Sequence, residues 1–189
     1  MKVKDGDDEL IKQAINGSQY AYRAIMAAYG SKLFNFIYRM VKNREDAEEI
    51  LQDVFINAFK KLDTFNYSSR FSTWLFQIAK NSSLNFLKKR KPDQVELTEE
   101  EIRSINKQSY GNDVEEKLDQ EIRQKQLIHL LSLLRDQDEL LLNLYYTQEL
   151  SITEIGEILN EKPNNIKIKL HRCRLKFKEL LVKFYSIKH

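Results

Sequence analysis

The chain has 189 residues, 42% of them hydrophobic, and a formal net charge of only +3, which allows one globular domain or two small ones. Its two prolines and five glycines leave long helical patterns uninterrupted, which favours an all-α protein. No run of about 18 apolar residues occurs, so we expect no direct membrane insertion. The first ten residues are too charged for a secretory signal, and the lone Cys173 excludes a disulfide framework. We therefore expect a cytoplasmic protein.

Charge is distributed unevenly along the chain. Residues 1–90 hold 15 Lys/Arg against 10 Asp/Glu, and residues 162–189 hold nine against one. The blocks between them are acidic, with six against ten in residues 91–126 and one against seven in residues 127–161. Two basic blocks separated by acidic ones indicate two contacts with a polyanion.

Helical periodicity in the first half of the chain predicts a domain over residues 8–91. The expected helices cover residues 8–16, 18–42, 44–62 and 71–90. Suitable N-cap residues are Ser18, Asn43 and either Ser69 or Ser72.

From Pro92 onward the chain loses its large apolar residues, which predicts a flexible acidic linker over residues 92–112. Helical patterning then resumes and predicts a second domain over residues 113–185. Its expected helices cover residues 113–134, 136–147, 151–160 and 163–185. The expected fold is therefore all-α, with two small helical domains joined by the linker.

The helix expected over residues 44–62 carries an acidic and amide ridge opposite its apolar side. The ridge consists of Asp46, Glu49, Gln52, Asp53 and Asn57. A solvated helix face is the ordinary explanation of such a stripe. The alternative is a docking surface for a basic partner helix.

Aromatic and cationic side chains alternate in residues 65–91, with amides and hydroxyls between them. Cations neutralise phosphates and flat rings stack on bases, so this mixture favours single-stranded nucleic acid. Trp74 lies at core spacing and is expected to pack inside the domain. The candidate contacts are Phe65, Tyr67, Arg70, Lys80, Asn81, Asn85, Lys88, Lys89 and Arg90.

Residues 151–178 have the pattern of two short helices joined by a tight turn. Ser151 and Glu154 have capping-box spacing, and Asn160 falls where a left-handed residue ends a helix. Pro163 is suited to the first turn of the next helix. Such a pair predicts a helix-turn-helix that enters a DNA major groove.

The second of these helices has an apolar inner stripe and a cationic outer face. The stripe consists of Ile166, Leu170, Cys173 and Phe177. The outward positions are Lys167, Lys169, His171, Arg172, Arg174 and Lys176. Cys173 therefore belongs to the packing face rather than to a reactive site.

Signals for catalysis are missing from the sequence. No Gly-rich phosphate loop occurs, and His129, His171 and His189 lie far apart. We therefore expect no enzymatic activity, no metal site and no cofactor.

Three collinear segments resemble bacterial sigma factors of the extracytoplasmic-function group, the two-domain branch of the sigma-70 family. Residues 46–65 resemble the helix that binds core polymerase, residues 71–91 the promoter-melting segment, and residues 151–174 the helix-turn-helix for the −35 element. The resemblance implies a transcription initiation factor that binds core RNA polymerase, through its β′ clamp and β subunits, and opens promoter DNA. An anti-sigma factor is a further partner that the resemblance implies.

The resemblance also assigns roles to the candidate residues. The acidic ridge would dock on the β′ clamp, while the loop at residues 65–71, together with Asn81 and Asn85, would hold an unstacked −10 base and the cations after Lys80 would grip the backbone. The residues at the positions that read or hold the −35 element are Asn164, Asn165, Lys167, Ile168, Lys169, His171, Arg172, Arg174 and Lys176.

Three departures from the family pattern occur in the helix-turn-helix. Asn160 replaces the turn glycine, residues 163–165 replace the small Gly-Thr entry, and Ile168 replaces a serine. Asn164, Asn165 and Ile168 lie where base edges would be read, so the family's common −35 sequence should not be assumed here. Two other functions stay open at this point: a stand-alone helix-turn-helix regulator, and an RNA-binding accessory protein that uses residues 65–91.

Overall fold

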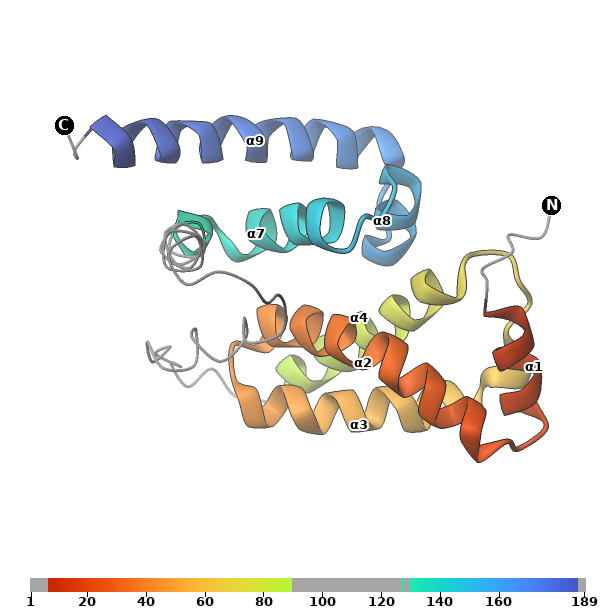
Figure 1. The fold of residues 1–189 in the computed structure, drawn as a ribbon. Helices are drawn as coiled ribbons and strands as arrows, with labels where there is room; N and C mark the ends of the chain where they lie inside the picture. Colours follow the sequence, from red (N-terminus) through yellow and green to blue (C-terminus); the bar gives the residue numbers. More distant parts are fainter. Residues whose placement is uncertain (1–6, 90–126, 128–129, 187–189) are drawn as a thin grey trace, which may run out of the picture.

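The computed structural model describes residues 7–89, 127 and 130–186, and every regular element in these residues is helical. In the first domain they are α1 (Asp8–Ile15), α2 (Gln19–Val41), α3 (Arg44–Lys60), a short 3₁₀ helix (Leu62–Thr64) and α4 (Phe71–Lys89) (Figure 1). In the second they are α7 (Asp136–Leu142), a π-helical turn (Asn143–Thr147), α8 (Ile152–Leu159) and α9 (Pro163–Ser186). The expected all-α class is confirmed, whereas the linker expected over residues 92–112 lies outside the described residues.

The first domain is a bundle of α2, α3 and α4, with α1 packed against α2. Phe36, Phe71 and Phe76 are its largest fully buried side chains, and the Phe36 and Phe76 rings meet edge to face with centroids 5.2 Å apart. Side-chain caps fix where two helices begin. The Ser18 hydroxyl accepts from the Ala21 N–H at 3.4 Å, and the Asn43 side chain accepts from the Asp46 N–H at 2.9 Å.

The second domain contains the expected helix-turn-helix. Ser151 and Glu154 form a capping box at the start of α8, since the Glu154 N–H donates to the Ser151 hydroxyl at 3.2 Å and the Ser151 N–H donates to the Glu154 carboxylate at 2.8 Å. Asn160 ends the helix in the left-handed conformation, at φ 57°. Pro163 is the first residue of α9.

Gly156 explains how the turn closes so tightly. A Cβ atom at this position would lie 2.7 Å from the backbone carbonyl oxygen of Glu161. The Glu161 N–H in turn donates to the Gly156 carbonyl at 2.8 Å. Only a residue without a side chain leaves room for this approach, so the glycine that the turn requires is at position 156 while Asn160 supplies the left-handed residue.

The two domains lie against each other. Helix α8 packs on α4, and α7 packs on α2 (Figure 1). Among the described residues, no helix combines the length and the apolar character that crossing a membrane requires.

Candidate nucleic-acid and polymerase interfaces

The acidic ridge occupies the outer face of α3. Glu49, Gln52, Asp53 and Asn57 are exposed, and Asp46 is half-buried at the start of the helix. The opposite side of α3 is closed by the core residues Ala47, Ile50, Val54 and Ala58. The ridge therefore faces solvent along most of its length, as the helical spacing predicted.

One apolar side chain interrupts this polar surface. Ile56 is 50% exposed and lies one turn beyond Gln52 and Asp53 on the same side of α3. The sequence interpretation did not include it, because an isoleucine in a helix is more often directed inward. Its position gives the ridge a hydrophobic contact point between hydrogen-bonding groups.

The aromatic residues at the start of α4 form a cluster of rings. The Phe65 ring lies 4.8 Å from Tyr67, 5.4 Å from Phe71 and 5.4 Å from Trp74, measured between centroids. Phe65 is only 6% exposed. This corrects the expectation that Phe65 faces nucleic acid, because its ring is used in packing and supports the loop from inside. Trp74 is half-buried against Phe65 and Phe71, in keeping with its predicted packing role.

The loop between the 3₁₀ helix and α4 borders a partly open cavity of about 400 Å³. Its walls combine two aromatic rings with hydroxyl and amide groups, from Thr64, Phe65, Asn66, Ser68, Ser69, Trp74, Gln77 and Glu157. The Asn66 side chain accepts from the Ser68 N–H at 3.1 Å and shapes the loop. Tyr67 adopts a left-handed backbone, with φ 58°. The sequence identified this segment as a loop but could not show which of its side chains converge.

Polar side chains continue from the cavity along one side of α4. Gln77 lines the cavity, and Asn81, Asn85 and Lys89 follow at intervals of one turn. Asn81, Asn85, Lys88 and Lys89 are exposed and Lys80 is half-buried. Arg90, the last candidate in this group, lies outside the described residues. The stripe and the cavity form one continuous surface, which we call the α4 surface.

The outer face of α9 presents all nine −35 candidates to solvent. Three of its cations already have partners: Lys169 pairs with Glu161 at 2.6 Å, Lys176 pairs with Asp138 at 2.6 Å, and Arg174 stacks over Tyr145 with 5.1 Å to the ring centroid.

Lys167, His171 and Arg172 differ from these three cations. Their side chains make no hydrogen bond or ion pair with any other residue in the described part of the chain. Ile168 lies beside them and is 53% exposed. The structure thus separates unpaired basic side chains near the start of α9 from cations that also hold the domain together.

Cys173 lies beneath this face as a buried hydrogen-bond donor. Its thiol contacts the Asp138 carboxylate at 3.1 Å, and burial together with that carboxylate raises the thiol pKa to about 12. Burial would also raise the pKa of Asp138, but hydrogen bonds from Lys176 and Cys173 outweigh it and hold that pKa below its ordinary value. The thiol is therefore protonated at neutral pH. No cluster of three or more potential metal ligands occurs in the described ranges.

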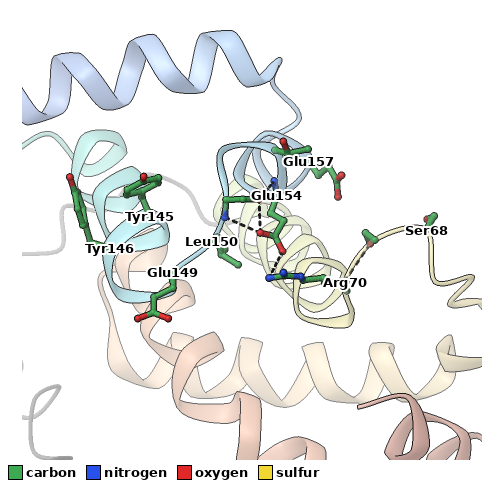
Figure 2. A pocket seen from close by; sticks show the side chains of 11 residues that line it. Ser68, Arg70, Tyr145, Tyr146, Glu149, Leu150, Glu154 and Glu157 are labelled. Atoms are coloured by element: carbon green, nitrogen blue, oxygen red, sulfur yellow. Dashed lines mark hydrogen bonds and ion pairs between the residues drawn. The ribbon is translucent and has the colours of Figure 1, made fainter. Parts of the chain in front are cut away.

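Three carboxylates of the second domain, Asp136, Glu139 and Glu154, reach cationic side chains of the first. Glu154 lies 3.3 Å from the Arg70 guanidinium and 3.4 Å from the Thr73 hydroxyl, which donates to it. Figure 2 shows the Glu154 carboxylate turned toward Arg70. Glu139 binds Arg39 and also lies 3.0 Å from the Lys42 ammonium. These contacts were not foreseen from the sequence.

A second cavity, of about 670 Å³, lies at this domain boundary. It is bordered by Arg70 and the neighbouring serines from the first domain and by Tyr145, Tyr146 and Glu149 from the second (Figure 2).

The fold and these surfaces define a two-domain helical protein with a helix-turn-helix in its second domain. The sequence matches the family descriptions Sigma-70 region 2 over residues 25–92 and Sigma-70 region 4 over residues 124–177. It is 35% identical over 174 residues to the ECF RNA polymerase sigma factor SigW of Bacillus subtilis, covering 87% of this chain and 90% of that protein. It is 30% identical to SigM of the same organism, covering 82% and 92%.

Two solved structures share the fold. CnrH in complex with the cytosolic domain of CnrY superposes with a TM-score of 0.66 at 21% identity, over 95% of this chain and 99% of that one. The sigma factor RpoE in complex with the anti-sigma factor NepR, from Bartonella quintana, gives a TM-score of 0.61 at 20% identity, over 85% and 96%. The chain belongs to the extracytoplasmic-function group of the sigma-70 family of RNA polymerase sigma factors. It is a promoter-directing transcription initiation factor, and these similarities give no support to a stand-alone regulator.

Proposed function

We propose that this chain binds core RNA polymerase through the α3 ridge and reads promoter DNA with the α4 surface and with the first half of α9. Family membership supports the general role. The observation that carries the residue assignment is the convergence of a loop cavity and a polar stripe on one side of α4. The working unit would consist of a domain at residues 8–91, a linker and a domain at residues 113–185, and it would act in the cytoplasm.

The α3 ridge would bind a basic coiled coil of the polymerase β′ clamp. Its acidic and amide groups can accept and donate hydrogen bonds along one face, and Ile56 adds an apolar contact in the middle. We include Glu49, Gln52, Asp53, Asn57 and the half-buried Asp46 in this interface. The β subunit would contact the second domain. This contact would determine where the helix-turn-helix lies on the polymerase.

Binding to core polymerase is tested by one charge reversal on the ridge and one elsewhere. Asp53→Lys is expected to abolish or strongly weaken the complex, because it places a cation against a basic partner. Glu9→Lys in α1 changes the net charge equally at an exposed site off the ridge. Equal loss of binding by both variants, measured by gel filtration with core enzyme, would reject the ridge as the interface.

On the α4 surface, the cavity would receive an unstacked base of the −10 element. Aromatic rings in the cavity wall can pack against a base while the hydroxyls and amides hydrogen-bond to it, and these contacts must offset the few kcal/mol that unstacking the base costs. Tyr67, Asn81 and Asn85 would contact bases, while Arg70, Lys80, Lys88 and Lys89 would hold phosphates. Phe65 is largely buried and would contribute only the small part of its ring that lines the cavity wall.

In the second domain, the start of α9 would enter the major groove at the −35 element. Asn164, Asn165, Lys167, Ile168, His171 and Arg172 are exposed there, and the apolar Ile168 suits a thymine methyl group. Lys169, Arg174 and Lys176 would contact phosphates once their present partners release them.

The decisive experiment is transcription from mapped start sites. Start sites are mapped after overexpression, and run-off transcription is then measured from those promoters with core enzyme, with and without this protein. Specific transcripts only in its presence are expected. Absence of both core binding and specific transcripts would reject the proposed function.

An anti-sigma factor is a further proposed partner. Both structural relatives described above were solved with a bound partner protein, and in one of them that partner is an anti-sigma factor. Such an inhibitor would cover the α3 ridge or the α9 face. A candidate that forms a stable complex with this chain, yet leaves transcription with core enzyme unchanged, would count against this role.

A further inference from the structure

Helix α8, with its carboxylates Glu154 and Glu157, lies on the same part of α4 that we assign to the −10 element. Glu154 is 9% exposed and accepts from Thr73, which is fully buried at the boundary. Its carboxylate also pairs with Arg70, just before the start of α4. Glu157, one turn further along α8, lines the loop cavity itself. Two carboxylates of one domain therefore occupy the nucleic-acid surface of the other.

A second ionic contact holds the domains together away from the α4 surface. Glu139 of α7 binds Arg39 and Lys42 at the end of α2, and Asp136 adds a contact 3.4 Å from the Lys42 ammonium. Glu139 is only 8% exposed, whereas Asp136 is largely exposed. Lys42 ends α2 in a left-handed backbone conformation, at the turn between α2 and α3.

A carboxylate and a phosphate compete for the same hydrogen-bond donors of an arginine. Both accept charge-assisted hydrogen bonds from the guanidinium, so Arg70 cannot give its best geometry to Glu154 and to DNA at once. The cavity has the same limitation, because the volume beside Glu157 is the volume a base would enter. Docking of α8 and binding of a −10 strand are thus mutually exclusive at two neighbouring points.

We propose that α8 is an intramolecular competitor of −10 DNA, which keeps the free chain in a closed state with the α4 surface covered. This inference rests on the proposed −10 role of that surface. The closed state opens when both ionic contacts separate. Since the Arg70 side chain is 50% exposed, salt screens its pair with Glu154, and a polyanion such as DNA displaces it.

The structure offers variants that weaken the closure without damaging the domains. Glu154→Gln removes the charge but keeps the capping box, because glutamine serves equally at that position. Glu139→Gln weakens the second contact, far from the proposed DNA contacts. Glu9→Gln in α1 is the matched control, since Glu9 is exposed and among the described residues its side chain forms a hydrogen bond only with Gln13 of its own helix.

The first measurement is the radius of gyration of the full chain by small-angle X-ray scattering, at low and high salt. The wild-type chain and E9Q are expected to be compact at low salt and to expand as salt rises. The double variant E139Q/E154Q is expected to be expanded at every salt concentration. A double variant as compact as wild type at low salt overturns the closure, whatever the chain does with DNA.

The second measurement is the affinity for a fluorescein-labelled pool of single-stranded DNA 12-mers of random sequence. If closure reduces the binding-competent fraction, E154Q and E139Q bind about 3- to 10-fold more tightly than wild type, because the apparent affinity scales with that fraction. E9Q controls for the lost negative charge and is expected to bind like wild type. An equal gain in all three variants overturns the competition.

The two measurements also separate this inference from the proposed function. If the variants expand but no form of the chain supports promoter-specific transcription with core enzyme, the −10 role fails and the competition fails with it, while closure itself stands. If transcription is normal but compaction is independent of Glu139 and Glu154, the proposed function stands and the competition is overturned.

Discussion

At the scale of single residues, Glu154 and Gly156 of the short helix α8 have several structural roles. Glu154 caps its own helix through Ser151 and pairs with Arg70 of the other domain. Gly156, two positions later, lets the turn close against Glu161. The same few residues therefore determine the shape of the helix-turn-helix and the contact between the domains.

A methyl group at position 156 tests the turn. Gly156→Ala is expected to destabilise the chain by about 1–3 kcal/mol, because the added Cβ must push the Glu161 carbonyl away. The matched control is Gly30→Ala, where an added Cβ meets nothing within 4 Å inside α2 and a gain of about 0.5–1 kcal/mol is expected. Urea unfolding followed by circular dichroism measures both. Equal effects of the two substitutions would contradict the proposed role of the close approach.

Asp138 gives the stability a specific dependence on pH. Its folded pKa is lowered below the unfolded value, so its contribution is complete above about pH 4 and is lost as the pH falls through the folded pKa. Asp138→Asn removes this titration and is expected to lose less stability than wild type between pH 7 and pH 3. Parallel losses for the two proteins in urea unfolding would show that the Lys176 and Cys173 contacts do not control the titration.

At the scale of elements, sequence patterns predicted most of this fold. Helix starts at Ser18, Asn43 and Ser151 follow from local hydrogen bonding, which is a property of neighbouring residues. The helix expected over residues 136–147 instead changes into a π-helical turn, where the Gln148 N–H donates to the Asn143 carbonyl at 3.0 Å. An apolar pattern does not distinguish an i→i+4 from an i→i+5 bond, so the sequence could not show this change.

The candidate sites were predictable to different extents. Helical spacing was enough to place the α3 ridge and the outward α9 cations on solvent-facing sides. It was not enough for Phe65, whose burial depends on rings from α4, or for Lys176, whose partner Asp138 lies 38 residues earlier. Contacts between distant segments depend on the assembled fold and leave no periodic signal in one sequence.

The cations of α9 are expected to have two different roles: some read bases, and others contact phosphates and stabilise the domain. Arg172→Ala should weaken binding to a mapped −35 duplex by about 1–3 kcal/mol if Arg172 contacts a base, and should relax specificity at one position. Lys176→Ala should weaken all duplexes more uniformly and also lower the unfolding free energy through the loss of its Asp138 partner. Fluorescence anisotropy with a set of base substitutions separates these outcomes. Identical profiles for the two variants would contradict the division.

At the scale of the whole molecule, acidic residues of the second domain pair with basic residues of the first. The acidic block before α9 carries Glu139 and Glu154, and both find cations in the basic first block. Arg39 and Glu139 are 100 residues apart in sequence. The charge pattern of the sequence indicates only a contact with a polyanion for the basic block of residues 1–90, and only a separator for the acidic block of residues 127–161. In the structure these two blocks also bind each other.

Exchange of one charge pair tests this match. Arg39→Glu and Glu139→Arg are each expected to expand the chain, because each places like charges at the boundary. The double substitution R39E/E139R restores an opposite pair and is expected to recover part of the compaction. The comparison forms a double-mutant cycle in scattering data. A double variant more expanded than both single ones would mean that the two side chains do not act on each other.

The buried thiol of Cys173 has a practical consequence for studying this motion. Alkylating reagents react with the thiolate, and a thiol with a pKa of about 12 and an exposure of 1% offers almost none at neutral pH. A cysteine introduced on the surface of each domain would therefore accept a fluorophore while the native one stays unlabelled. The natural chain can therefore be labelled without first replacing Cys173. Single-molecule fluorescence can then follow its opening and closing when polymerase and DNA are added.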